Sequence, residues 1–92
     1  MMVIVRTYSA GCHAGELESR DGKEVVLTDA RRLWSWRGAL SLSELASVGS
    51  TRPSECRFSV AVPRITLTEV IEVIEMTAVG VSALAAIPPF KS

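Results

Sequence analysis

The sequence predicts a mainly β (α+β) fold, a small five-stranded β-meander or partly open barrel with one or two short helices. Three observations predict it. Short runs rich in β-branched residues recur along the chain, an Asp-Gly pair separates two of them, and helix-capping signals flank only short segments. At 92 residues the chain is expected to form a single domain, residues 1–92, around one core.

Two strands are expected at the N-terminus. Residues 3–8 are β-branched or aromatic apart from one arginine, and the turn-prone residues 9–11 follow them. Residues 13–19 form the second expected strand. The Asp21-Gly22 dipeptide accepts the positive φ of a type I′ turn, so a tight hairpin is expected to follow.

The third strand is expected to begin at residues 24–28 and to resume over residues 31–36. The apolar alternation changes phase near Asp29, which indicates a β-bulge at that position. We therefore expect one interrupted strand.

A short helix is expected after residue 40. Ser41 and Glu44 fit a capping box, apolar residues follow at helical spacing, and Gly49 stands where a C-terminal cap belongs. These signals predict a two-turn helix, and the composition of residues 50–55 predicts a loop after it.

Two further extended segments are expected. Residues 58–62 alternate as a strand, which Pro63 is expected to end or bend. Residues 65–76 carry conflicting patterns, because their apolar spacing fits a helical face while their density of Ile, Val and Thr favours a strand. We interpret this segment as a strand.

The C-terminal segment, residues 77–92, is predicted to be an apolar helix and tail. Thr77 is a suitable N-cap for a helix through Ala86, which Gly80 weakens. No charged residue occurs from Met76 to Phe90, so the helix lacks an adequate polar face. Either it is buried against a second copy in a homo-oligomer, which we favour, or one side packs on the sheet and small alanines face water.

Charge and composition exclude several classes of function. Ten Lys and Arg balance ten Asp and Glu, so coating of nucleic acid by a cationic surface is not expected. We expect neither a signal peptide nor a membrane-spanning helix, which needs ~20 apolar residues. Cys12 and Cys56 are interpreted as reduced thiols of a cytoplasmic protein, with one disulfide between them as the alternative.

The most informative stretch is the basic-aromatic run, residues 31–37, which holds both tryptophans and three arginines. In a strand, Arg32, Trp34 and Trp36 share one face. Two indoles offer a stacking wall for a purine or nicotinamide ring, and a guanidinium binds phosphate with two hydrogen bonds. Alternatively, both tryptophans belong to the core and the arginines cover their edges. Both interpretations stay open.

The first strand and its turn supply further candidates for the same pocket. Arg6 and Tyr8 repeat the pairing of a cation with an aromatic ring, and backbone amides of residues 9–11 add donors. A small anionic, aromatic ligand suits this chemistry, and no metal or cofactor is expected. The predicted ligand-binding residues are Arg6, Tyr8, Ser9, Gly11, Arg31, Arg32, Trp34 and Trp36.

No catalytic constellation is expected. Cys12 and His13 are adjacent in a strand, so their side chains point to opposite faces and form no dyad. Glu69, Glu72 and Glu75 recur without an accompanying His or Asp, which favours a solvated face over a metal site. We therefore expect a protein that is not an enzyme.

Five strings carry a family resemblance, namely VRTYSAG at 5–11, GKEVVL at 22–27, ARRLWSW at 30–36, SLSELA at 41–46 and LTEVIE at 67–72. They resemble a family of small, largely uncharacterised bacteriophage and prophage proteins. The resemblance runs from Val3 to about Met76, whereas the C-terminal segment departs from it. It implies no established activity.

A phage origin implies a role by analogy alone. Small oligomeric phage proteins include sponges that sequester nucleotide signals of bacterial immunity, such as cyclic oligonucleotides and cyclic ADP-ribose isomers. We therefore expect a nucleotide-binding homo-oligomer in the host cytoplasm. The alternatives are a structural or protein-interaction module, such as a phage accessory factor or an inhibitor of a host protein, and a single-stranded nucleic-acid binder, against which the neutral net charge counts.

Overall fold

The protein is an open six-stranded antiparallel sheet with two short helices, which confirms the mainly β prediction. The computed structural model describes residues 1–90. The elements in chain order are β1 (Met2–Thr7), β2 (Cys12–Asp21), β3 (Glu24–Ser35), α1 (Leu42–Val48), the 3-10 turn η1 (Pro53–Glu55), β4 (Arg57–Phe58), β5 (Val62–Leu67), β6 (Val70–Glu75) and α2 (Ala78–Ala85). The strand order is β4-β3-β2-β1-β6, and β5 also pairs with β3.

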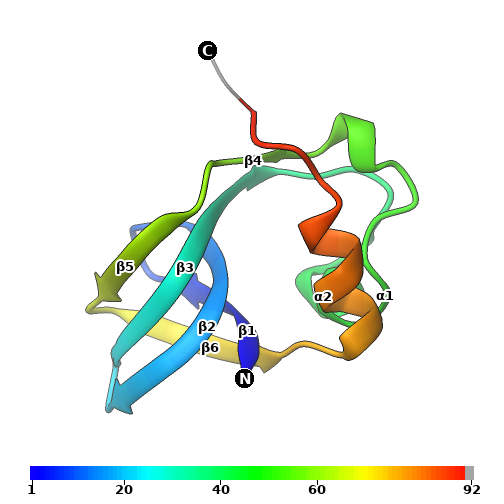
Figure 1. Cartoon of the computed structure of the whole chain (residues 1–92). Coiled ribbons are helices and arrows are strands. Elements are labelled where there is room, and N and C mark those ends of the chain that lie inside the picture. Colours follow the sequence, from blue (N-terminus) through cyan, green and yellow to red (C-terminus); the bar gives the residue numbers. More distant parts are fainter. Residues whose placement is uncertain (91–92) are drawn as a thin grey trace.

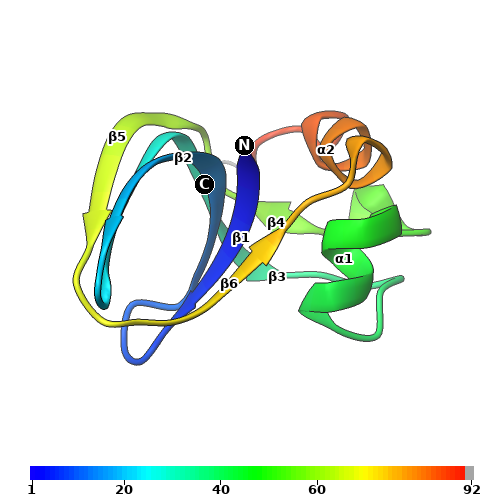
Figure 2. The same ribbon diagram turned by 90° about the horizontal axis from the view of Figure 1, so that it is seen from below.

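The sheet curls on itself into a partly open barrel. Figures 1 and 2 show β1, β2, β3, β5 and β6 around a common interior, with both helices to one side. The tip of the β2–β3 hairpin reaches the start of β6, where the Val70 amide donates to the Lys23 carbonyl at 3.0 Å. The curl therefore gives the sheet an inner face and a face that carries the helices.

The hairpin expected at Asp21-Gly22 is present, but its turn type differs from the prediction. Asp21 pairs with Glu24, which leaves Gly22 and Lys23 as the two loop residues. Of these two loop residues, only Gly22 has a positive φ, which is 60°. A positive φ at the first loop residue alone belongs to a type II′ turn, because type I′ needs it at both.

The bulge expected near Asp29 is also present. Asp29 has a φ of 50°, and the β2–β3 register shifts where Gly15 faces Asp29 and Ala30. A Cβ on Gly15 would lie 3.0 Å from the Thr28 carbonyl oxygen, so the strands approach closely here. The bulge bends β3 and helps the sheet to curl.

Residues 58–62 do not form the single strand that was predicted. The strand is divided into β4 and β5, and both pair with the same edge of β3. Ser59 causes the division, because its hydroxyl accepts from the Arg32 amide at 2.8 Å and donates to the Val60 carbonyl at 2.9 Å. Pro63 does not end a strand but lies inside β5, near the start of an edge strand where a missing N–H is tolerated.

The strand interpretation of residues 65–76 is confirmed, with an interruption. β5 ends at Leu67 and β6 begins at Val70, so a two-residue turn lies within the segment. Leu67 and Val70 are both buried on the inner face. The turn shifts the phase of the alternation between the two strands, which accounts for the helix-like spacing in the sequence.

The sheet separates two apolar clusters, where the sequence predicted one core. The inner cluster lies within the curl, and the helix-side cluster lies between the sheet and the helices. Val3 and Val5 point inward while Ile4 points to the helices, as expected for a strand buried on both faces. The inner cluster comprises Val3, Val5, Val25, Leu27, Ala30, Leu67 and Val70, and the helix-side cluster comprises Ile4, Ala14, Leu33, Leu45, Ala46, Cys56, Phe58, Leu84 and Ile87.

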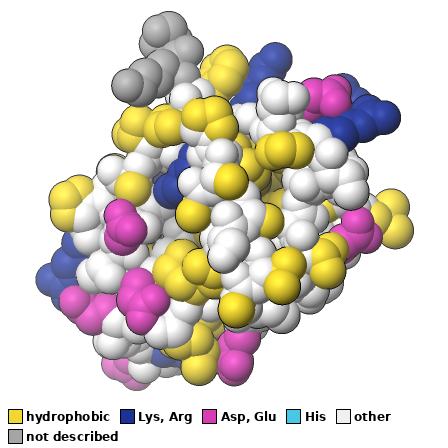
Figure 3. All heavy atoms as spheres, turned by 45° about the vertical axis from the view of Figure 1, so that its right-hand side comes forward, with side chains coloured by type: hydrophobic (Ala, Val, Ile, Leu, Met, Phe, Trp, Pro, Cys, Tyr) yellow, Lys and Arg dark blue, Asp and Glu magenta, His cyan; other side chains and the backbone are white. Residues whose placement is uncertain are grey.

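Both helices begin at the expected caps. The hydroxyls of Ser41 and Thr77 accept from the amides of Glu44 and Gly80, at 3.2 and 3.0 Å. One side of α2 packs on α1, and its other side leaves apolar residues such as Val79 exposed. Figure 3 shows hydrophobic side chains at the surface of the face that carries the helices. Within residues 1–90, neither helix has the length and apolar character needed to cross a membrane.

Candidate functional site

The basic-aromatic run is divided between the two faces of the sheet. Arg32 and Trp34 line a pocket on the inner side. Leu33 and Trp36 pack against the helix-side cluster. β3 ends at Ser35 after a register shift against β4, so regular alternation stops before the second tryptophan. The structure therefore does not bring both indoles to one surface.

Arg31 holds the C-terminal end of α2 against the sheet. Its guanidinium donates to the carbonyls of Ser59, Leu84 and Ile87 at 2.9, 2.9 and 2.8 Å. It also lies over the Phe58 ring, 5.5 Å from its centroid. Burial lowers the pKa of Arg31, and these carbonyls replace the lost water. This side chain is occupied by the fold rather than turned toward a ligand.

Arg32 and Trp34 lie together at one end of the curl, in a cavity that we call the mouth pocket. Its volume is about 220 Å³. Trp34 is 57% exposed and forms an accessible wall. The lining residues are His13, Ala30, Arg32, Trp34, Ser59, Val62 and Ile65.

His13 forms a buried polar end of the mouth pocket. It is 1% exposed, and its Nε2 accepts from Arg32 Nε at 3.2 Å. Because a guanidinium has no acceptor, the imidazole proton must be on Nδ1, which has no partner among the described residues. Burial and the Arg32 charge lower the pKa of His13 to about 4. His13 is therefore neutral at pH 7.

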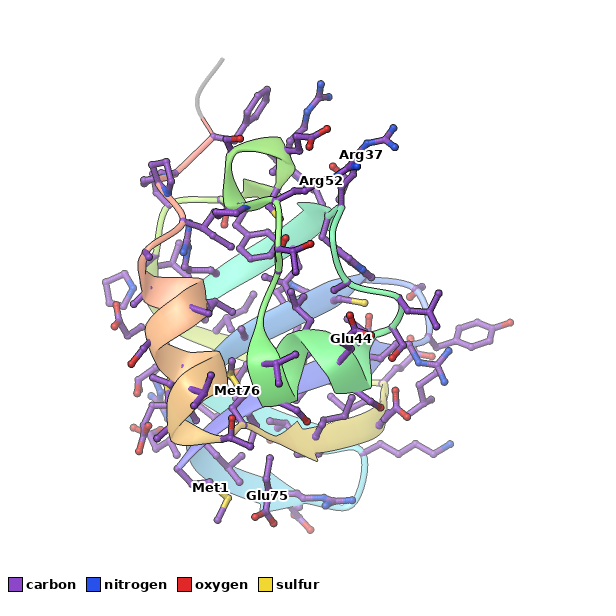
Figure 4. The ribbon with its side chains drawn as sticks, turned by 90° about the vertical axis from the view of Figure 1, so that its right-hand side faces the viewer. Met1, Arg37, Glu44, Arg52, Glu75 and Met76 are labelled. Carbon is purple, nitrogen blue, oxygen red and sulfur yellow. The ribbon has the colours of Figure 1, made fainter. Side chains whose placement is uncertain are left out.

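A larger pocket, which we call the β3–β4 pocket, opens on the other side of the strand end. Its volume is about 740 Å³, and it combines Trp36 and Phe90 with Arg37 and Arg57. The Arg57 guanidinium lies 5.0 Å from the Phe90 ring centroid. Figure 4 shows Arg37 at the same end of the molecule as η1. Ser35, Ser54, Glu55 and Cys56 complete the lining.

Sequence reasoning missed Arg57 and Phe90, and it did not include Arg37 among the predicted ligand-binding residues. Phe90 reaches the pocket because its amide donates to the Phe58 carbonyl at 2.8 Å, which adds the tail to the edge at β4. Its ring also meets Trp34 edge to face, with centroids 6.1 Å apart. The Trp34–Phe90 pair therefore stands between the two pockets. The only signal in the sequence was a lone aromatic residue in the apolar tail.

Arg6 and Tyr8 lie apart from both pockets. Arg6 pairs with Glu72, with 3.2 Å between Nε and Oε1. Tyr8 is 77% exposed and borders a different hollow, with Lys23 and Glu69. The structure does not bring these predicted residues to the tryptophans.

Ser9 and Gly11 belong to a turn that is closed by its own hydrogen bonds. The Thr7 hydroxyl donates to the Gly11 carbonyl and accepts from the Ala10 amide, each at 2.8 Å. Gly11 has a φ of 80°, a conformation that favours glycine. These residues shape the β1–β2 turn and do not line the pockets described above.

Cys12 and His13 point to opposite faces, as predicted. Cys12 packs on the helix-side cluster and His13 lies against the mouth pocket. Both cysteines are free, and burial raises the pKa of the Cys12 thiol. The two side chains therefore do not form a thiol–imidazole pair.

The fold and these pockets define a small, β-rich domain in which three arginines and three aromatic residues line two pockets beside the end of β3. The chain belongs to the family described as a domain of unknown function, DUF6948, whose model matches residues 1–84. The match covers all six strands and most of α2. No curated protein and no solved structure matches the chain.

Proposed function

We propose that this protein is a non-enzymatic binding protein that holds a small anionic, aromatic ligand of the nucleotide class in the β3–β4 pocket. One observation carries the proposal, namely that two aromatic residues and two arginines line a single pocket. Its volume of about 740 Å³ lies within the roughly 300–1,000 Å³ of small-molecule sites.

The chemistry of the lining supports this class of ligand. Trp36 is half-buried against the helix-side cluster, so its indole is a rigid surface for stacking a base. Arg37 and Arg57 form no ion pair with any residue between 1 and 90, so both remain available to phosphate oxygens. Stacking and charge-assisted hydrogen bonds together give affinity without any chemical step.

The biological role that we propose is a sponge for nucleotide immune signals, such as cyclic oligonucleotides or cyclic ADP-ribose isomers. The resemblance to phage proteins supports this role. We further propose that the sponge acts in the host cytoplasm as a homo-oligomer. The exposed apolar residues Val48 and Val79, 59% and 61% exposed, support self-association.

Isothermal titration against cyclic dinucleotides, cyclic trinucleotides and cyclic ADP-ribose isomers tests the proposal. At least one ligand is expected to bind saturably. Arg37→Gln and Arg57→Gln are each expected to weaken that binding by about tenfold or more, because each removes a charge-assisted contact. Arg64→Gln removes the same charge from an arginine outside the pocket, paired with Glu18, and is expected to bind normally.

The second candidate is a structural or protein-interaction module. The hydrophobic side chains on the helix-bearing face favour it (Figure 3). No binding across the nucleotide panel, together with a stoichiometric protein partner in a pull-down, would replace the first proposal with this one. Salt-sensitive binding of single-stranded oligonucleotides would instead favour a nucleic-acid binder.

A further inference from the structure

We infer that the mouth pocket is a second binding site, which takes the carboxylate group of a small aromatic acid. It shares no lining residue with the β3–β4 pocket. Its volume of about 220 Å³ is below the usual range for ligands of nucleotide size and suits a single substituted ring. The inference therefore does not depend on the proposed nucleotide binding.

The polar end of the mouth pocket has donors without acceptors. Arg32 uses Nε on His13, and its two NH2 groups have no hydrogen-bond partner among residues 1–90. The His13 Nδ1 proton is buried and also has none. Arg32 is an exposed residue, so its NH2 groups can meet an acceptor that enters the pocket, whereas the buried His13 Nδ1 is the kind of unsatisfied group that native proteins rarely leave.

Ser59 does not correct this deficit. Its hydroxyl accepts from the Arg32 backbone amide and donates to the Val60 carbonyl, and it forms no hydrogen bond with the Arg32 guanidinium or with His13. No acidic residue lines the pocket, and His13 is neutral, so Arg32 is the one charge there. A ligand that matches the pocket therefore carries negative charge and supplies acceptors.

The other lining residues indicate that the part of the ligand beyond its carboxylate is apolar. Ala30, Val62 and Ile65 are apolar, and Trp34 presents an accessible indole. A flat apolar ring fits these walls, while a planar carboxylate matches the two NH2 groups of the guanidinium. An inorganic phosphate ion has the charge but no apolar body to bury.

Benzoate is the probe that tests the inference, in an NMR titration of the full chain at pH 6.5. We expect saturable shifts of the Trp34 indole and of the His13 imidazole, with the Trp36 indole unmoved. His13 is the only histidine, so its signal is unambiguous. Benzamide keeps the ring but not the charge, and is expected to bind at least about tenfold more weakly.

Two variants localise the site. Arg32→Gln is expected to weaken benzoate binding by about tenfold or more, whereas Arg20→Gln, on an exposed arginine outside the pocket, is expected to change nothing. Val62→Phe fills the pocket from an edge residue that is 39% exposed, and is expected to block binding in a folded protein. The inference is overturned if benzoate causes no saturable shift, if benzamide binds equally well, or if inorganic phosphate displaces benzoate at equal concentration.

Discussion

Arg31 differs in role from its neighbour Arg32 because of the strand alternation. Its side chain faces the helices, where three carbonyls and the Phe58 ring surround it. The carbonyls of Leu84 and Ile87 lie at the end of α2. The positive charge of the guanidinium also interacts favourably with the negative end of the helix dipole at the C-terminus of α2. One side chain therefore connects β3, the β4–β5 link and α2.

Replacing Arg31 by Met is expected to lower the free energy of unfolding by about 2–4 kcal/mol, because buried carbonyls lose their donor. Arg31→Lys keeps the charge but not the planar arrangement of donors, so it is expected to be destabilised as well. Urea unfolding followed by circular dichroism measures both. Arg20→Gln is the control and is expected to stay within about 0.5 kcal/mol of the parent. A free energy of unfolding of Arg31→Met equal to that of the parent would contradict the role of Arg31 in holding α2 against the sheet.

His13 is expected to make stability depend on pH between about 4 and 6.5. Its pKa is about 4 in the folded protein, against an ordinary value of 6.5. Above pH 6.5 the imidazole is neutral in both states, so the stability is fully present. As the pH falls, the unfolded chain binds a proton that the folded protein does not, and stability decreases by up to about 3 kcal/mol.

Urea unfolding at intervals from pH 7.5 to pH 5 measures this dependence. His13→Gln keeps a polar side chain that does not titrate, so its curve isolates the contribution of His13 from that of the carboxylates. The parent is expected to lose more stability than the variant over this range. Parallel curves would contradict the lowered pKa.

The two helices contact each other through small residues. A Cβ on Gly80 would lie 1.9 Å from the Ala46 carbonyl oxygen, and one on Gly49 would lie 2.3 Å from the Ala83 Cβ. The Thr77 amide adds a hydrogen bond to the Ala46 carbonyl at 3.1 Å. The glycine that weakens α2 as an isolated helix is therefore required for α2 to approach α1.

Gly80→Ala is expected to destabilise the protein by about 1–3 kcal/mol, because the added methyl group overlaps the backbone of α1. Helix propensity alone predicts the opposite sign, a gain of about 1 kcal/mol. Ser82→Ala, on the exposed side of the same helix, is the matched control and follows propensity. Thermal unfolding distinguishes the two effects, and a Gly80→Ala protein more stable than the parent would contradict the close packing.

At the scale of the whole molecule, one sheet serves two apolar clusters. The curl closes the inner cluster, and α1 and α2 cover the other face. Both arginine-aromatic pockets lie near the part of β3 where its pairing with β5 ends and its pairing with β4 begins. The continuous sheet is interrupted at this edge, which leaves room for the pockets. The candidate sites are thus a consequence of how the sheet ends.

The sequence predicted those features that depend on near neighbours. The strands, the Asp29 bulge, the hairpin after Asp21 and the Ser41 cap each follow from a few adjacent residues, because backbone conformation and capping are local. The division at Ser59 was not predictable in this way. It depends on hydrogen bonds to Arg32, which lies 27 positions away.

Within the site, the sequence by itself determined that arginines and tryptophans are concentrated in residues 31–37. Only the tertiary structure decided their roles. It placed Arg31 under α2, Arg32 and Trp34 in the mouth pocket, and Trp36 beside Arg57 and Phe90. The physical reason is that a side chain's face follows from strand register and sheet curl, and both are set by contacts between residues far apart in the chain.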